Sequence, residues 1–384
     1  MKASTTPTAD HGQTANDLHT HVLDPLNAGD CLEKWQELAK NALEPNPFFG
    51  PDFLIPFLDE MGRRNVRLLA VSSATSGDWL LAAPVAPRKV GLTIPAATAW
   101  ATEFGPLGAP LLAPGAPPFA VPTFLNLITR TTGLPLAAFP YIPLDGPAAA
   151  ALGSAAGWRT ISANEASRAS HASGNEGEAQ FAKAFSGKRR KELPRLIRRL
   201  SAQGEVKFES HRHDEAIRQF ENFLQLEASG WKGKRGTALL SHHNSATFAR
   251  QMISQRAAVD AVRLDAISVA ERPIAMLVVL LEAGRAFSWK IAYDEAYARF
   301  SPGAQLTLFA FERNLRDPAI SGADSLAVPG HPMIEPLWRG RMRYGTLLCA
   351  KSAPGRVMQT LGAKDLTLEQ DLRRFARKIL RRAS

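Results

Sequence analysis

The segment YDEAYARFSPGAQLTLF, residues 293–309, has the residue types and spacing of an anion-binding turn. An apolar run ending in WKIAY predicts a buried strand, and Ser-Pro-Gly before a periodic apolar run predicts a helix start. The first N–H groups of a helix have no partner within it and form the positive end of its dipole, so they attract phosphate. An ordinary strand-to-helix turn has the same pattern. The residues predicted to hold a pyrophosphate are Arg299, Ser301, Pro302, Gly303, Ala304 and Gln305.

A second segment, EASGWKGKRGTAL at 227–239, combines three glycines with one tryptophan and three basic residues. Lys232, Lys234 and Arg235 suit an anionic substrate or the phosphates of a cofactor. Trp231 suits an acyl chain or a ring. A mobile loop with solvated lysines is the plain alternative.

Composition limits the class of protein. The 384 residues are 45% hydrophobic and 21% charged, which is typical of a soluble globular chain of two to three domains. No apolar run reaches the ~20 residues of a membrane span, and the N-terminus lacks the apolar core of a secretion signal. We therefore expect a cytoplasmic protein. Cys31 and Cys349 lie far apart in the sequence without metal-ligand spacing, so no metal site is expected.

The net charge of +10 is concentrated in two segments. Residues 188–199 hold seven Lys or Arg and one Glu, and residues 373–382 hold six with no acid. Such segments favour an acidic partner: a phosphate-rich cofactor, a membrane surface or nucleic acid. Both also have helical apolar spacing, so a half-buried helix with a solvated basic face is the alternative.

The order of predicted helices and strands is similar on both sides of residue 170. Residues 161–179 are rich in Ser, Ala, Gly and Glu without an apolar period, which predicts a linker. We expect an α+β fold of two tandem halves, each a mostly antiparallel twisted sheet flanked by helices. The predicted boundaries are a disordered tail at 1–29, an N-terminal domain at 30–165, a linker at 166–180, a C-terminal domain at 181–352 and a basic amphipathic helix at 353–384.

Six segments together resemble the GNAT acyltransferases, in particular their CelD/BcsL-type branch, which is related to the FemAB proteins. The resemblance covers most of residues 45–350. It implies two GNAT-like halves, an active site in the second half, and acetyl-CoA or another acyl-CoA as donor. Many GNAT enzymes have Arg/Gln-x-x-Gly-x-Gly/Ala at the pyrophosphate, whereas this chain has one more residue before Gly303. The segments are NPFFGPDFL (46–54), FGPLGAPLL (104–112), KRRKELPRLIRRL (188–200), EASGWKGKRGTAL (227–239), YDEAYARFSPGAQL (293–306) and GADSLAVPGHPMIEPLWRGR (322–341).

The resemblance also implies direct acyl transfer, and the sequence has no Gly-x-Ser-x-Gly nucleophile motif. Direct transfer needs donors to the carbonyl oxygen and a base for the amine proton. We expect backbone N–H groups at the end of strand 285–293 to contact that oxygen. Glu227 and Asp294 are the candidate bases, Tyr293 can return a proton to the thiolate, and His331 of HPMIEPLW is a further catalytic candidate. In this fold segment 227–239 borders the acceptor, which predicts a lid. The expected substrate contacts are Trp231, Lys232, Lys234, Arg235, Trp289 and Lys290.

The expected acceptor is a small amine or hydroxyl compound, such as an amino sugar or another saccharide precursor of the cell envelope. The first alternative is FemAB-like transfer from aminoacyl-tRNA. The second is a non-catalytic basic adaptor of envelope or polysaccharide assembly. The C-terminal basic helix is expected to contact an anionic membrane surface, which would make the protein peripheral to the inner membrane.

Overall fold

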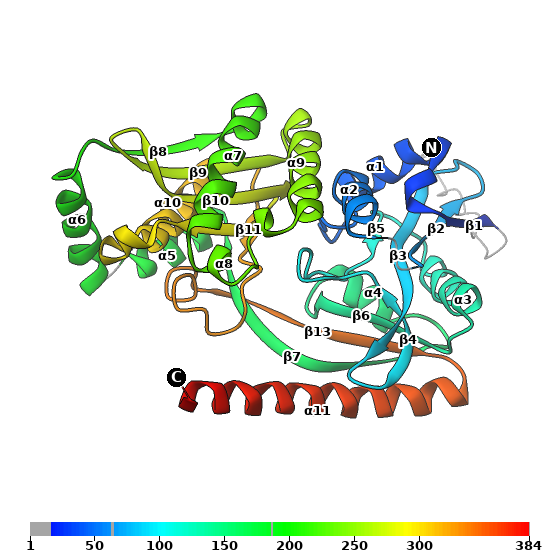
Figure 1. The fold of residues 1–384 in the computed structure, drawn as a ribbon. Helices are drawn as coiled ribbons and strands as arrows, with labels where there is room; N and C mark the ends of the chain where they lie inside the picture. Colours follow the sequence, from blue (N-terminus) through cyan, green and yellow to red (C-terminus); the bar gives the residue numbers. More distant parts are fainter. Residues whose placement is uncertain (1–16, 63–64, 186, 384) are drawn as a thin grey trace, which may run out of the picture.

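The computed structural model describes residues 17–62, 65–185 and 187–383. One mixed sheet of 13 strands runs through both halves of the chain (Figure 1), in the order β1-β2-β3-β4-β6-β13-β7-β12-β11-β10-β9-β8, with β5 paired to β3. The strands are β1 (Leu18–Leu23), β2 (Arg67–Ser73), β3 (Trp79–Val90), β4 (Ile94–Ala99), β5 (Leu111–Leu112), β6 (Leu136–Pro143), β7 (Arg159–Ala172), β8 (Val206–His211), β9 (Val262–Val269), β10 (Arg272–Glu282), β11 (Arg285–Tyr293), β12 (Gly322–Asp324) and β13 (Gly340–Ala350).

The strand order has the same pattern from either end. In the first half β2, β3 and β4 form an antiparallel meander, and α3 (Ala120–Thr132) leads to β6, parallel to β4. In the second half β9, β10 and β11 form the meander, and α10 (Pro302–Arg316) leads to β12, parallel to β11. The halves exchange strands at the centre, because β7 pairs with β12 and β13 pairs with β6. The fold class expected from the sequence is confirmed.

The remaining helices surround this sheet. They are α1 (Leu32–Asn41), α2 (Pro51–Met61), α4 (Pro147–Gly153), α5 (Gly174–Ala184), α6 (Lys188–Ser201), α7 (His213–Ser229), α8 (Trp231–Lys234), α9 (His243–Ala258) and α11 (Ala353–Ala383), with the 3-10 helices η2 (Pro25–Asn27), η3 (Gly29–Cys31), η4 (Leu239–Ser241) and η5 (Glu295–Phe300).

Strand β10 shows why its sequence is apolar without alternation. Met276, Val278 and Leu280 belong to a core that includes the apolar faces of α7 and α9. Leu277 and Val279 belong to a second core with side chains of α10. Successive strand residues face opposite sides of a sheet, so a strand covered by helices on both faces needs apolar residues throughout.

The predicted linker at 166–180 is wrong. Residues 159–172 form β7, which pairs with β13 and β12, and residues 174–184 form α5. The small residues that suggested a linker are the ones that fit here: Ala169 and Ser170 are buried in the middle of the sheet. The predicted end of the C-terminal domain also changes, because β13 lies in the sheet beside β6 of the first half.

Part of the predicted N-terminal tail is structured, and the helix expected at the C-terminal end forms. Residues 18–23, placed in the predicted disordered segment 1–29, form β1 and pair antiparallel with β2. Residues 1–16 lie outside the described part of the chain. The basic C-terminal segment forms α11, whose first half packs against β7 and β13.

Candidate active site between two parting strands

A cavity opens where the parallel strands β11 and β12 separate. They pair only over Arg285↔Gly322, Ala286↔Ala323 and Phe287↔Asp324. Beyond that point, β11 residues 288–293 and chain residues 325–327 line the two sides of a cavity of ≈280 Å³. The end of α7, α8 and residues 331–334 complete its wall.

A β-bulge lies on the same stretch of β11. Val278 of β10 is opposite Lys290, whereas the next residue, Val279, is opposite Ser288. Trp289 is therefore an extra residue in β11. Bulges of this kind are common next to active sites, because they redirect side chains and local backbone groups.

The backbone direction after the bulge follows from two contacts. The Asp294 N–H donates to Ile274 O of β10 (2.8 Å), whereas Ile291 O accepts from Lys232 Nζ (3.2 Å) on the cavity side. Backbone groups of successive strand residues point to opposite edges, and each residue directs its N–H and C=O to the same edge. The N–H groups of Ile291 and Tyr293 are therefore directed at the cavity.

Glu227 is buried, and both of its oxygens are occupied. Oε1 accepts from Lys232 Nζ and Oε2 accepts from the Leu239 N–H, each at 2.8 Å. The carboxylate thus joins the end of α7 to both ends of the segment 232–239. Its geometry is that of an anchor for the predicted lid, because each oxygen already accepts a hydrogen bond from this segment.

The rest of the predicted lid faces partly away from the cavity. Trp231 lines the cavity and is 48% exposed, and its backbone N–H donates to Glu295 Oε1 (2.8 Å). Lys234 Nζ donates to Glu295 Oε2 (2.9 Å), and Arg235 stacks on the Trp231 ring at 5.2 Å. Of the three basic residues, Lys232 alone lines the cavity.

Two buried polar atoms of the cavity wall have no hydrogen-bond partner among the described residues, Ser288 Oγ and His331 Nδ1. Buried polar groups are usually satisfied, so unpaired ones that line a cavity indicate a ligand or water. Burial lowers the pKa of His331, an effect that Glu335 opposes. The imidazole is therefore neutral at pH 7 and able to accept a proton.

Lys290 also lines the cavity. Its Nζ lies 5.3 Å from the Phe104 ring centre and 5.5 Å from the Trp289 ring centre. Burial lowers the pKa of Lys290, while nearby Glu227 raises it. Phe104 comes from the loop after β4, and its carbonyl oxygen accepts from Trp289 Nε1 at 2.7 Å. The first half of the chain therefore supplies part of the surroundings of this lysine.

The structure thus brings seven predicted residues together and leaves others outside. Asp294 does not line the cavity: it caps η5 through the Ala296 N–H and pairs with Arg272 at 2.9 Å. Arg299 is exposed and stacks on Phe300 at 4.8 Å. Sequence reasoning missed Ser288, although a serine inside a buried apolar run is a usable signal. The predicted residues that line the cavity are Glu227, Trp231, Lys232, Trp289, Lys290, Tyr293 and His331.

The predicted pyrophosphate turn forms the start of α10, beside the cavity. Ser301 has left-handed backbone (φ 53°), Pro302 opens the helix, and the Gln305 side chain turns inward to Phe300 O. Ala304 is half-buried. A Cβ placed on Gly303 would lie 2.6 Å from Met333 Sδ. The close approach that Gly303 permits is therefore made by Met333, and a ligand at this glycine requires Met333 to move.

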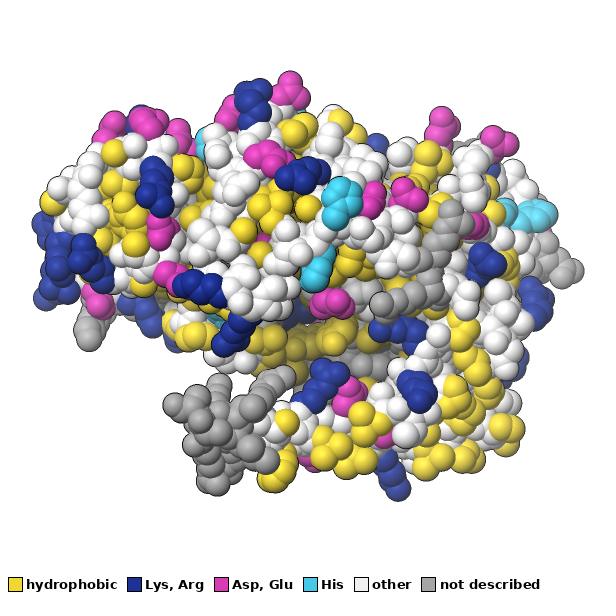
Figure 2. Space-filling model, viewed as in Figure 1, with side chains coloured by type: hydrophobic (Ala, Val, Ile, Leu, Met, Phe, Trp, Pro, Cys, Tyr) yellow, Lys and Arg dark blue, Asp and Glu magenta, His cyan; other side chains and the backbone are white. Residues whose placement is uncertain are grey.

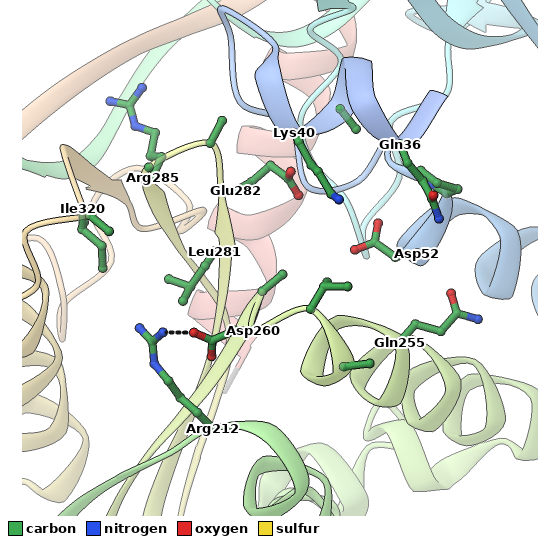
Figure 3. Close-up of a pocket in the computed structure, with 18 of the residues that line it drawn as sticks. Gln36, Lys40, Asp52, Arg212, Gln255, Asp260, Leu281, Glu282, Arg285 and Ile320 are labelled. Atoms are coloured by element: carbon green, nitrogen blue, oxygen red, sulfur yellow. Dashed lines mark hydrogen bonds and ion pairs between the residues drawn. The ribbon is translucent and has the colours of Figure 1, made fainter. Parts of the chain in front are cut away.

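A larger cavity of ≈810 Å³ lies between the two halves (Figure 3) and contains none of the predicted residues. Its acidic side chains have guanidinium partners. Arg256 binds Asp52 (2.7 Å) and Glu282 (2.8 Å), and Arg212 binds Asp260 (2.7 Å) and Asp317 (2.9 Å). Arg256 is fully buried and also donates to Leu281 O, so this network ties α2 of the first half to β10 of the second.

Comparison with known proteins agrees with the fold. Residues 187–326 match the family model described as the acetyltransferase (GNAT) domain, a range that runs from α6 to the cavity wall after β12. No curated protein matches the chain.

Solved structures resemble this chain at identities that show the fold alone. FemX has 9% identity and a TM-score of 0.55, covering 86% of this chain and 98% of that one. The C-terminal domain (DUF2156) of a putative lysylphosphatidylglycerol synthetase from Agrobacterium fabrum has 12% identity and a TM-score of 0.52, covering 87% and 95%. A conserved protein of unknown function from Bacteroides thetaiotaomicron VPI-5482 has 10% identity and a TM-score of 0.53, covering 85% and 97%.

Residues 187–326 therefore form a GNAT-type acetyltransferase domain, and the fold of the chain is the one that these solved structures share. Among the residues described, no group of three or more His, Cys, Asp or Glu is arranged to hold a metal ion. None of the helices in the described part combines the length and apolar character needed to cross a bilayer.

Proposed function

We propose that the protein is an acyl-CoA-dependent N-acyltransferase of the CelD/BcsL-type branch, with the cavity between β11 and β12 as its active site. The observation that carries the proposal is the direction of the Ile291 and Tyr293 N–H groups into that cavity. A thioester oxygen within reach of these fixed donors gains negative charge as the amine attacks. Preorganised backbone donors stabilise that charge without reorganisation during the reaction.

The side chains around these donors fit the remaining steps. The amine nitrogen forms the new C–N bond, the C–S bond breaks, and His331 Nδ1 takes the proton that the nitrogen loses. The Tyr293 hydroxyl supplies a proton to the departing thiolate. Neither step needs a covalent enzyme intermediate. Glu227 and Lys232 neutralise each other, so they position the lid segment and leave proton transfer to His331.

The cavity walls support a saccharide amine as acceptor. Trp231 at the exposed edge and Trp289 at the bulge offer apolar surfaces for a ring. Lys290 has no hydrogen bond or ion pair within the described residues, so an anionic substituent on the acceptor gains a partner there. We propose an amino sugar or a related amine of envelope polysaccharides.

Isothermal titration with acetyl-CoA and longer acyl-CoAs tests the donor. We expect one site per chain with a dissociation constant between about 1 μM and 1 mM, the usual range of KM values. CoA lacking an acyl group serves as control for binding through the nucleotide alone. Absence of binding for every acyl-CoA would overturn the proposal.

Helix α6 supports a second candidate, transfer from aminoacyl-tRNA. It packs against η5 next to the predicted pyrophosphate turn. Five basic residues on it are exposed and make no ion pair with the described residues, and they give the dark blue group over α6 in Figure 2. They are Arg190, Lys191, Arg195, Arg198 and Arg199. Nucleic acid held by such a helix binds with a steep salt dependence. If aminoacyl-tRNA is the donor, Arg190→Glu combined with Arg198→Glu should abolish tRNA binding. If acyl-CoA is the donor, the same variant should bind acyl-CoA like wild type.

A further inference from the structure

Helix α11 has a docking face and an opposite face with different character. Gly355, Gln359, Gly362 and Leu366 are buried against the sheet. Gln359 Nε2 donates to Arg159 O (2.7 Å) and Leu348 O (2.6 Å), which fixes the rotation of the helix. Figure 1 shows α11 along one edge of the molecule, beneath β7 and β13. Its other face is therefore turned outward by the docking contacts.

The outward face carries a stripe of exposed large apolar side chains. At 100° per residue the five positions fall within an arc of about 60°, and they extend over about 27 Å of helix. Hydrophobic side chains follow this outer edge of α11 in Figure 2. The exposed fractions are 60% for Val357, 47% for Leu361, 52% for Leu368, 49% for Leu372 and 64% for Phe375. Isolated exposed apolar residues are normal, but an aligned series of five marks an interaction surface.

The charge along the same helix selects the kind of partner. From residue 373 to 382 the sequence has six Lys or Arg and no acid. Arg373 and Arg374 are exposed and pair on the same helix with Glu369 and Asp371, and Lys364 lies at the margin of the stripe. An apolar stripe on a helix with Lys364 at its margin and a Lys- and Arg-rich C-terminal end matches an anionic lipid surface, where apolar side chains enter the acyl boundary and basic ones contact the headgroups.

A second copy of the chain fits this face less well. Pairing through a heptad seam needs apolar residues at each turn, but the turn between Leu361 and Leu368 has Lys364 and Asp365. Asp365 Oδ2 already accepts from the Leu92 and Thr93 N–H groups at 3.0 and 2.7 Å. Two such helices would also bring two clusters of positive charge together.

We propose that the outward face of α11 binds the surface of an anionic membrane, with the helix lying in the plane of the interface. The protein is then peripheral to the membrane. This inference is independent of the acyl-transfer chemistry, because none of these residues lines the cavity between β11 and β12.

Flotation of the full chain with lipid vesicles tests the proposal. Wild type should bind vesicles that contain phosphatidylglycerol, lose most of this binding in high salt, and bind phosphatidylcholine vesicles weakly. Leu368→Glu combined with Phe375→Glu should abolish binding. Arg373→Ala combined with Arg374→Ala should weaken it by up to roughly twentyfold, because a basic residue near an anionic surface contributes a factor of up to about five, and these two also pair with Glu369 and Asp371.

Thr367→Glu is the matched control, since Thr367 is exposed on the same helix but outside the stripe. It should bind like wild type, and all variants should keep the wild-type melting temperature and acyl-CoA affinity. Equal binding of wild type and the Leu368→Glu/Phe375→Glu variant would overturn the proposal. So would a wild-type dimer in solution that Leu368→Glu converts to monomer.

Discussion

Lys232 Nζ lies 2.8 Å from Oε1 of the buried Glu227 carboxylate. The Lys232 side chain is partly exposed, whereas the Glu227 side chain is not exposed at all. Removing the lysine therefore leaves a buried charge with a single backbone donor. Together with the contacts of Glu295 to Trp231 and Lys234, the pair holds α8 over the cavity.

Lys232→Met should destabilise the protein by about 3 kcal/mol, because breaking a buried ion pair from one side leaves the other charge uncompensated. Urea unfolding at pH 7 measures this. The double variant Glu227→Gln/Lys232→Met should recover most of the loss, since no unpaired charge remains. A single variant as stable as wild type would show that the pair does not anchor the segment.

His331→Gln should lower kcat by about 10²–10⁴-fold, the usual contribution of a general base, with little change in acyl-CoA affinity. The pH profile separates this role from a structural one. Burial lowers the pKa of His331 from its usual 6.5, so wild-type activity should stay constant through neutral pH and fall on acidification below that value. The variant should lack this acid limb. An unchanged acid limb in the variant would assign the proton to another group.

The backbone direction in β11 is testable with proline, which removes one N–H group. Ile291→Pro should remain folded and lose turnover, because its N–H faces the cavity and takes no part in the ladder with β10. Ala292→Pro should unfold the sheet locally, because its N–H faces β10. Circular dichroism and single-turnover assays compare the two. Full activity of Ile291→Pro would contradict the proposed contact with the thioester oxygen.

Glu44 predicts a pH effect on stability. It is 3% exposed, its Oε2 has no partner, and burial raises its pKa to about 7 while Arg285 opposes the rise. The folded state therefore binds more protons than the unfolded state between pH 4.5 and 7, and this group makes stability fall as pH rises through that window. Glu44→Gln should be more stable than wild type at pH 8 by up to about 3 kcal/mol, at ~1.4 kcal/mol per pH unit. At pH 4 the two should be alike.

Urea titrations from pH 4 to 8 give the difference directly. A Glu44→Gln effect of the same size at both ends of the range would mean that the substitution acts through packing and not through the buried charge.

The sequence predicted well those features that local pattern controls. The periodic apolar faces of α7 and α10 and the apolar run of β10 gave the correct element types, and His331 of the HPMIEPLW segment lines the cavity. The sequence patterns gave wrong predictions where contacts between residues far apart in the sequence determine the structure. The Ser- and Ala-rich sequence of β7 resembles a linker, but in the structure β13 and β12 pair with this strand along its two edges. The Met333 contact with Gly303 joins residues thirty positions apart, and no spacing rule relates them.

The roles of Glu227 and Asp294 show the same limit. Both are acids at the ends of regular elements, which made them equal as candidate bases. Their partners distinguish them from His331: Glu227 is bound by Lys232 and Leu239, and Asp294 by Arg272 and Ala296. His331 Nδ1 has no hydrogen-bond partner in the part of the chain that the structure describes. The type of a residue does not tell whether its side chain is buried or whether its polar atoms have hydrogen-bond partners in the fold.

A crystal structure of the protein with a non-hydrolysable acyl-CoA analogue tests the central claim most directly. We expect the acyl carbonyl oxygen between β11 and β12, within hydrogen-bond distance of the Ile291 or Tyr293 N–H, and Met333 displaced from Gly303. An analogue bound in the cavity between the two halves, or one whose acyl group does not reach β11, would contradict the assignment of the active site.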